Sequence, residues 1–195
     1  MAQDPQLAAL LWSLLGYVIL PLWLLAGVAD YVVHARTGIA HTSGVHESAL
    51  HLLQTAEIGV PMLALLFLEA TPPVLLLALA GAALHTLTAY RDLRWAAPRR
   101  RITVFEQFVH GFLIVLPLFA LALVAVLHWP AWRALLPPFD AGPAGWGLRW
   151  RDPQFPPATL ATILGASVLF GVVPGTIEFA RTLAARRPVD PSVAP

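Results

Sequence analysis

Five long apolar stretches recur along the chain, and each is long enough to cross the hydrocarbon core of a lipid bilayer. A membrane-spanning helix needs about 20 mostly apolar residues. Because the stretches recur throughout the 195 residues, a signal peptide at the start does not explain them. The sequence predicts an all-α fold, a polytopic membrane bundle that forms one transmembrane domain over residues 1–182. Its five expected spans are residues 7–33, 50–68, 73–90, 104–127 and 158–180.

The overall composition supports this interpretation. Hydrophobic residues make up 58% of the chain and charged residues 12%, about half the charged fraction of an ordinary soluble domain. A chain of this length has no core large enough to hide so much apolar surface, so we expect membrane lipids to cover it in the cell (inner) membrane. The absence of cysteine excludes disulfides and thiolate metal ligands. A net charge of +1 gives no reason to expect a nucleic-acid partner.

Arginine is unevenly distributed between the two sides of the predicted bundle. All twelve basic residues are arginines, and three of them lie in the long loop at residues 128–157. The other nine are Arg36, Arg91, Arg94, Arg99, Arg100, Arg101, Arg181, Arg186 and Arg187. Since arginine-rich loops stay in the cytoplasm, we expect the N-terminus outside, the C-terminus in the cytoplasm and a cytoplasmic tail at residues 183–195. The 128–157 loop, rich in Trp and Pro, is then a cap on the outer face.

Histidines and carboxylates gather at the expected cytoplasmic ends of the first four spans. Three pairs have i,i+4 spacing, which places both side chains on one helical face. A fourth pair is seven residues apart and also shares a face. These candidate metal ligands are Asp30 with His34, Glu47 with His51, Glu106 with His110, and His85 with Asp92. Four antiparallel helices would therefore each offer one imidazole and one carboxylate at the same end of the bundle.

Two further residues are candidates near these pairs. His46 precedes Glu47 and is a further possible metal ligand. Glu57 lies about three helical turns deeper than His46, well inside the second span. Ionisable residues at such depth are costly and mark function. We interpret Glu57 as a candidate catalytic residue, which could act as a ligand, a proton relay or the partner of an inward arginine.

This donor set favours a metal over simple ion pairs. Neutral imidazoles do not cancel the charge of carboxylates, whereas a metal cation satisfies both. Mixed histidine and carboxylate ligands suit iron, manganese or zinc. Eight or more candidate ligands exceed what one tetrahedral zinc uses. Helix bundles hold two irons with such groups, so we predict a dinuclear centre with two iron ions, and zinc or manganese as alternatives.

The placement of histidines at the cytoplasmic ends of spans, over residues 30–110, resembles the integral-membrane histidine-motif di-iron hydroxylases and desaturases. That class carries H-x3-4-H and H-x2-H-H clusters, whereas this chain has no adjacent histidine pair and is closer to soluble ferritin-like sites. The resemblance implies an enzyme that oxidises a hydrophobic or lipid substrate by hydroxylation or desaturation. The sequence has no flavin, nucleotide or haem-attachment motif, so the electrons would come from a separate donor protein.

Other functions fit the same residues. A zinc-dependent membrane hydrolase would use Glu47, Glu57 or Glu106 as its base. A b-type haem protein would bind haem through two of the histidines. A metal or proton transporter would use Glu57 as a relay inside the membrane. The alternative without a chemical function is that these residues only cap helix ends at a solvated rim of the bundle.

Two local expectations concern charged residues outside these pairs. Glu178 precedes Arg181 by three residues and is expected to form a surface ion pair with it, and the run from Arg99 to Arg101 is interpreted as a topology signal.

Overall fold

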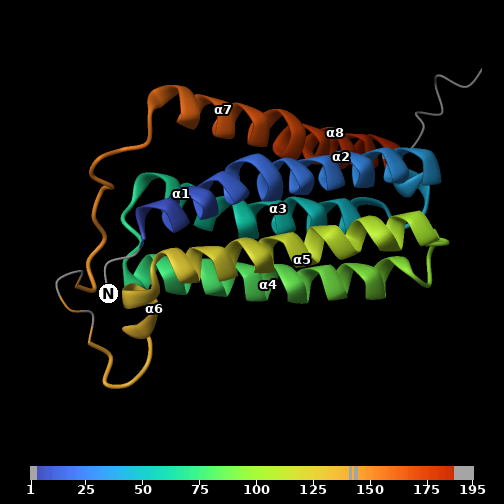
Figure 1. The fold of residues 1–195 in the computed structure, drawn as a ribbon. Helices are drawn as coiled ribbons and strands as arrows, with labels where there is room; N and C mark the ends of the chain where they lie inside the picture. The colour runs from blue at the N-terminus through green and yellow to red at the C-terminus, as the bar shows by residue number, and fades with distance from the viewer. Residues whose placement is uncertain (1–3, 141, 143–144, 187–195) are drawn as a thin grey trace, which may run out of the picture.

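The computed structural model describes residues 4–140, 142 and 145–186, and nearly all of its regular structure is helical (Figure 1). The predicted all-α architecture is confirmed, since the described residues contain no strand and only one isolated bridge, between Leu68 and Trp150. The α-helices are α1 (Pro5–Leu14), α2 (Leu20–Thr37), α3 (Gly44–Phe67), α4 (Pro72–Ala96), α5 (Val104–Leu127), α6 (Trp129–Arg133), α7 (Pro157–Ser167) and α8 (Val173–Ala185).

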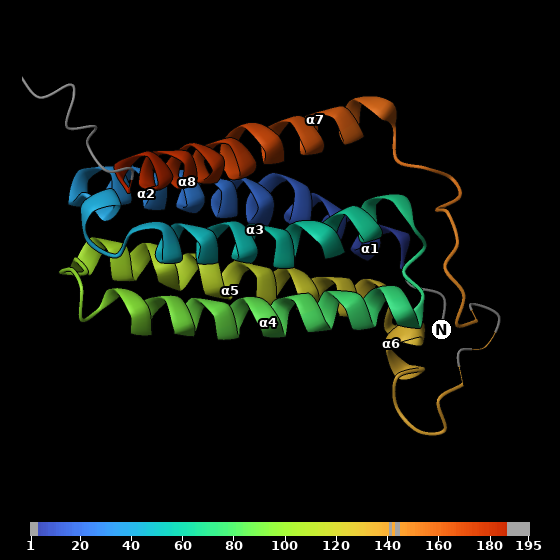
Figure 2. The same cartoon turned by 180° about the vertical axis from the view of Figure 1, so that it is seen from behind.

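Two of the long helices are assembled from shorter pieces. The π-helical segment η1 (Leu15–Ile19) joins α1 to α2, and η4 (Val168–Val172) joins α7 to α8. The five resulting helices are long and apolar enough to cross a membrane, which is consistent with a multi-pass membrane protein. They run back and forth along one bundle (Figures 1 and 2).

Each π-helical segment ends two residues before a proline. Pro21 follows η1 and Pro174 follows η4. A proline has no N–H to donate and its ring crowds the preceding turn, so the turn widens. The sequence predicts kinks at these two prolines and at Pro61 and Pro117, and the last two lie inside α3 and α5.

The helix boundaries differ from the predicted spans mainly where charged residues lie. Helix α3 begins at Gly44 instead of residue 50, and α4 ends at Ala96 instead of residue 90. Each extension adds polar residues that hydropathy alone excludes from a span. The two carboxylates among them, Glu47 and Asp92, are buried, so their charges do not face lipid, whereas Arg91 and Arg94 are exposed. Helix α8 likewise continues to Ala185, and the rest of the predicted tail, residues 187–195, lies outside the described residues.

The helices pack as two pairs with the last helix laid over them. Helix α3 packs on α4, α2 packs on α5, and α8 contacts both α2 and α3. The connections η2 (Ile39–His41) and residues 97–103 lie at the same end of the bundle as the end of α8 (Figure 1). The long loop after α6 lies at the opposite end and contacts the α3–α4 turn, where the backbone N–H of Arg151 donates a hydrogen bond to Phe67 O.

Candidate metal centre

Ionisable side chains from five helices converge at the end of the bundle that holds η2. Most of them are buried, although together they carry many formal charges. Helices α2, α3, α4, α5 and α8 each contribute, and the α4–α5 loop adds one arginine. The residues are Asp30, His34, Glu47, His51, Asp92, Arg100, Glu106, His110 and Glu178. We refer to this set as the buried cluster.

His34 lies at the centre of the buried cluster and is fully buried. Its Nδ1 lies 3.1 Å from Glu178 Oε2. A carboxylate only accepts hydrogen bonds, so Nδ1 carries the proton and donates it. Nε2 faces oxygens of Asp30 at 3.5 Å and Glu106 at 3.4 Å, with Glu47 at 3.9 Å. All of these neighbours are acceptors, so the ring is either doubly protonated or presents the Nε2 lone pair to a cation.

Glu178 holds a second histidine in the same way. Its Oε1 accepts from His51 Nδ1 at 2.7 Å, and the rings of His51 and His34 stack with centroids 4.6 Å apart and planes 7° from parallel. His51 Nε2 lies 3.1 Å from Asp92 Oδ2. Both partners of His51 are acceptors, so the ring is either doubly protonated or presents Nε2 to a cation. Metal-bound histidines commonly donate their other N–H to a carboxylate, which is the role Glu178 can fill for both rings.

The predicted partner of Glu178 was therefore wrong. The sequence predicted a surface ion pair with Arg181, but the Glu178 carboxylate is buried against the two histidines. The Arg181 guanidinium instead lies over the Tyr31 ring, 5.8 Å from its centroid. The i,i+3 spacing of Glu178 and Arg181 permits an ion pair but does not determine which face of the helix points into the bundle. Helix α8 is rotated so that Glu178 faces α2 and α3.

Two groups within the buried cluster have the spacing of a metal site. The ligand atoms of Asp30, His34 and His110 lie within 4.8 Å of one another, and so do those of His34, Glu47 and His51. His110 Nε2 is 3.0 Å from Asp30 Oδ1. Each group combines two histidines with one carboxylate, which is a common ligand set for divalent metals. The buried side chains could hold a metal ion.

Arg100 is part of the buried cluster, a role that the interpretation of the run from Arg99 to Arg101 as mainly a topology signal did not include. Its guanidinium bonds Glu47 and Glu106, and its Nε lies 3.1 Å from Glu47 Oε1. Burial lowers the pKa of Arg100, but the two carboxylates outweigh this effect and raise it above the usual value. Glu106 also closes a capping box with Thr103 at the start of α5. The first turn of α5 is thereby fixed in place beneath the arginine.

The charges of the buried cluster do not balance among its own residues. Five carboxylates face one guanidinium, which leaves four negative charges if the histidines are neutral. Buried charges need partners. Four buried atoms in the cluster have no hydrogen-bond partner of acceptable geometry: three potential metal ligands, Asp30 Oδ1, His34 Nε2 and Asp92 Oδ1, and one donor, Arg100 Nη1. This donor set fits added cations.

The structure does not bring the remaining candidates into the buried cluster. Both ring nitrogens of His85 face backbone carbonyls, Leu113 O at 3.1 Å and Gln54 O at 3.3 Å. Leu113 O lacks its helical donor because residue 117 is proline, so His85 satisfies a carbonyl that the proline leaves free. Among the described contacts, His46 packs on Trp95 with ring centroids 4.0 Å apart.

Glu57 lies deeper in the bundle than the cluster. Its Oε1 accepts a hydrogen bond from Thr88 Oγ1 at 2.7 Å. Its other oxygen, Oε2, is buried without a partner among the described residues. The predicted catalytic role of this carboxylate stays a prediction.

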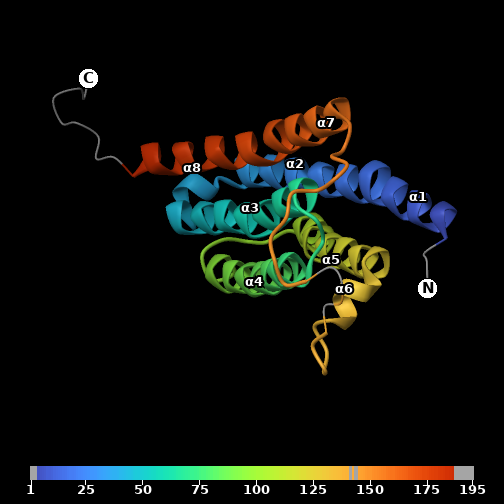
Figure 3. The ribbon, with the colours of Figure 1, turned by 90° about the vertical axis from the view of Figure 1, so that its left-hand side faces the viewer.

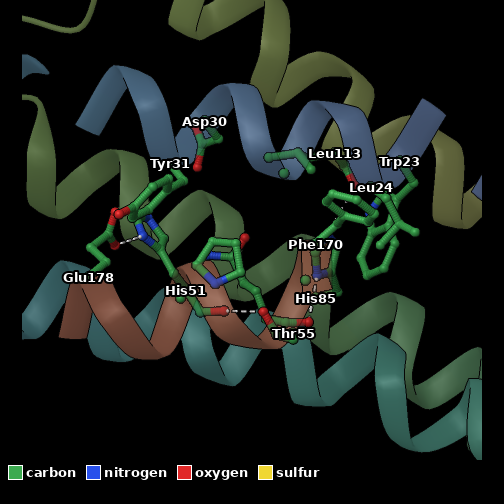
Figure 4. A pocket seen from close by; sticks show the side chains of 15 residues that line it. Trp23, Leu24, Asp30, Tyr31, His51, Thr55, His85, Leu113, Phe170 and Glu178 are labelled. Atoms are coloured by element: carbon green, nitrogen blue, oxygen red, sulfur yellow. Dashed lines mark hydrogen bonds and ion pairs between the residues drawn. The ribbon is translucent and has the colours of Figure 1, made fainter. Parts of the chain in front are cut away.

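A small cavity of about 90 Å³ adjoins the buried cluster (Figure 4). Asp30, His51 and Glu178 lie at one end of it, and Trp23 and Phe170 lie at the other. The cavity connects the charged groups with apolar side chains from α2 and η4. It therefore gives a small molecule room to approach the cluster.

Sequence reasoning found most of the cluster but did not place Glu178 or Arg100 in it. Glu178 carried a usable signal, because it is a carboxylate inside a predicted span and such residues face the bundle interior. Arg100 is one of three consecutive arginines, and nothing local separates it from its neighbours.

Comparison with protein-family models, with characterised proteins and with solved structures gives no match. Over the part of the chain that the structure describes, the fold and the site define a class on their own: a helical protein with five helices of membrane-spanning length and a buried histidine–carboxylate cluster that could hold a metal ion.

Proposed function

We propose that this chain is a multi-pass membrane metalloenzyme that binds two iron ions in the buried cluster and oxidises a hydrophobic substrate by hydroxylation or desaturation. The observation that carries the proposal is the ligand composition of the two groups, each with two histidines and one carboxylate. That combination, with open positions left over, is typical of non-haem iron(II) oxygenases.

The charge of the buried cluster supports two ions over one. Two divalent cations cancel the four negative charges that remain after Arg100 is counted. The two groups share His34, so the group that gives up His34 needs another ligand. We assign Asp30, His34 and His110 to one ion. The other ion keeps Glu47 and His51, and Asp92, whose Oδ2 lies 3.1 Å from His51 Nε2, takes the place of His34.

The other residues have supporting roles in this proposal. Glu178 orients the two stacked histidines, and Arg100 holds Glu47 and Glu106 in place. Glu57, with one unpartnered buried oxygen, is the candidate proton carrier. When bound, iron supplies the activation of dioxygen, and a separate donor protein supplies the electrons.

Metal analysis tests the proposal directly. Protein purified without chelator and without metal-affinity resin is expected to hold about two iron ions per chain. His110→Ala is expected to lower the iron content, because it removes a ligand, whereas His128→Ala at the opposite end leaves it unchanged. Iron-free protein, or equal iron in the wild type and both variants, contradicts the proposal.

A zinc-dependent hydrolase is the second candidate. The group of Asp30, His34 and His110 offers three ligands, the number that catalytic zinc sites use while a fourth position holds water. Zinc at about one ion per chain, with activity that does not depend on oxygen, would favour this function over the first.

We also propose that the buried cluster lies at the cytoplasmic side of the cell (inner) membrane. Nine of the twelve arginines support this orientation, with the N-terminus outside and the C-terminus in the cytoplasm. The chain has no cysteine, so single cysteines introduced at Ala97 and at Asp140 can be labelled without background. A membrane-impermeant reagent added to intact cells should label only the Asp140→Cys variant, and labelling of Ala97→Cys alone reverses the orientation.

A further inference from the structure

A second and larger cavity lies in the half of the bundle away from the buried cluster. Its volume is about 510 Å³, within the range of roughly 300–1,000 Å³ that small-molecule sites occupy. Its lining is mostly apolar and comes from α1, η1, α2, α3, α4, α5 and α7, including Gly16, Pro61, Ala78, Ala120 and Ile163. We refer to it as the large cavity.

Two of the helices that line the large cavity lie at the outside of the bundle. No residue of α1 or α7 is buried, and α7 diverges from the rest of the bundle toward its first residue (Figures 1 and 3). Lipid would cover the exposed faces of these two helices. An apolar molecule would therefore reach the large cavity from the membrane by passing between helices that are not tightly packed.

Trp23 links the large cavity to the small cavity beside the cluster, because it lines both. Its Nε1 is buried and has no hydrogen-bond partner among the described residues. An indole N–H only donates, so the missing partner is an acceptor such as a hydroxyl or carbonyl oxygen. The junction therefore suits a molecule that turns from apolar to polar at this point.

The small cavity limits the polar part of that molecule. Its volume is about 90 Å³, against about 510 Å³ for the large cavity, so the head end of the molecule must be much smaller than its chain. Asp30 and Glu178 line it, and an anionic headgroup would add negative charge to a site whose carboxylates already exceed its cations.

The two π-helical segments also lie along this route. Gly16 and Tyr17 of η1 line the large cavity, and Phe170 and Gly171 of η4 line the small one. Single π-helical turns inside α-helices occur frequently at functional sites. Membrane spanning does not require π-helical turns, so the positions of η1 and η4 beside the two cavities support a role in binding.

We propose that the two cavities together bind one single-chain lipid with a small neutral oxygen headgroup, a long-chain alcohol or aldehyde. Its hydrocarbon chain lies in the large cavity, its oxygen accepts a hydrogen bond from Trp23 Nε1, and its head end faces the buried cluster. This inference deepens the proposed function and rests on it only for the reaction, since binding of the chain needs no metal.

Photo-crosslinking in lipid nanodiscs tests the binding site. The probe is hexadecanol that carries a diazirine at the far end of its chain. We expect the label on α1, α3, α5 or α7 at residues of the large cavity. Gly16→Phe and Ala120→Phe fill the cavity and are expected to reduce labelling about tenfold. Label spread evenly over lipid-facing residues, or unchanged labelling in both variants, overturns the proposal.

The same substitution elsewhere provides the matched control. A Cβ at Gly16 or Gly165 would meet no atom within 4 Å, so both helices can accept a side chain. Gly165 lies on α7 and lines neither cavity, and Gly165→Phe is expected to label like the wild type. A loss of labelling in Gly165→Phe as large as in Gly16→Phe contradicts the proposal.

Competition by unlabelled lipids tests the headgroup. Hexadecanol is expected to compete better than palmitate or dipalmitoyl phosphatidylcholine. Trp23→Phe keeps an aromatic ring but removes the N–H, so the advantage of hexadecanol over hexadecane should fall roughly threefold to tenfold. Equal competition by palmitate, or an unchanged advantage in Trp23→Phe, overturns the headgroup assignment.

The experiment is run on chelated and on iron-loaded protein, with iron content measured in parallel. Site-specific labelling of protein that binds no iron supports the lipid site while the proposed enzymatic function fails. Iron binding without site-specific labelling supports the metal centre while the proposed lipid site fails. The two proposals can therefore fail separately.

Discussion

The two ends of the bundle are held together by different forces. At the cluster end, Glu47, Glu106 and His34 are fully buried, and directed hydrogen bonds and ion pairs join α2, α3, α5 and α8. At the opposite end α1 and α7 bury no residue, and a cavity of about 510 Å³ lies between the helices. In lipid, apolar side chains gain little by leaving lipid for each other. Helices α1 and α7 therefore pack loosely at this end, although the start of α4 remains closely packed there, with Val74 and Leu75 fully buried.

The largest expected effect comes from the guanidinium at the cluster end. Arg100→Ala leaves Glu47 and Glu106 buried without their cation, which should cost about 3–5 kcal/mol of stability. Thermal unfolding in detergent, followed by circular dichroism, measures this loss. Arg101→Ala is the control, because Arg101 is exposed. If both variants unfold at the same temperature, the cluster end is not held together in the way described.

Removing the carboxylate shared by the two histidines should weaken metal binding without removing a proposed ligand. Glu178→Gln loses the acceptor that orients His34 and His51, and the affinity for iron(II) should fall about 10- to 100-fold. Anaerobic titration of the purified protein measures it. Glu69→Gln at the other end, where Glu69 pairs with Arg149, is expected to bind iron like the wild type. Unchanged affinity in Glu178→Gln removes its assigned role.

The contact between α3 and α4 offers a test midway between the two ends. A Cβ at Gly81 would collide with the carbonyl oxygen of Glu57 and would lie 2.6 Å from Pro61 Cγ. Gly81→Ala should therefore destabilise the protein by about 1–3 kcal/mol. Gly59→Ala meets no atom within 4 Å and should stabilise it by about 0.5–1 kcal/mol. The unfolding temperature is expected to fall in Gly81→Ala and to rise in Gly59→Ala. Shifts of the same sign in both variants would contradict the close packing of α3 on α4 at Gly81.

The smallest effect is expected at the end away from the cluster. Burial, with Arg151 nearby, lowers the pKa of His128 from 6.5 to about 4. The unfolded chain then binds a proton between these pH values while the folded chain does not, so stability falls as the pH drops from 6.5 to about 4. His128→Asn should show a shallower decline in unfolding temperature over this range. An identical decline means that His128 does not titrate as described.

Much of the fold could be predicted because the signal is local. A run of about 20 apolar residues predicts a span wherever it occurs, and the predicted limits of the fourth span, residues 104–127, coincide with α5. Helices α3 and α4 extend beyond the predicted spans because hydropathy assigns Glu47 and Asp92 to the surface. Only their contacts with Arg100 and His51 make their burial possible.

The buried cluster was predicted in part for a similar reason. The i,i+4 pairs place Asp30 with His34 and Glu106 with His110 on common faces, and the structure joins both pairs around His34 and Asp30. His85 has the same kind of spacing to Asp92, yet it bonds the carbonyl that Pro117 leaves free. Spacing cannot distinguish a residue that faces the cluster from one that faces a neighbouring helix.

The sequence by itself determined the helical class, the number of helices of spanning length, and the end of four helices at which histidines and carboxylates gather. Only the tertiary structure decided that Glu178 from the last helix and Arg100 from a loop complete the cluster, and that a cavity remains at the other end. The physical reason is that lipid is as apolar as the bundle interior. Hydropathy therefore cannot report how each helix is rotated, and the polar contacts that set the rotation join residues far apart in the chain.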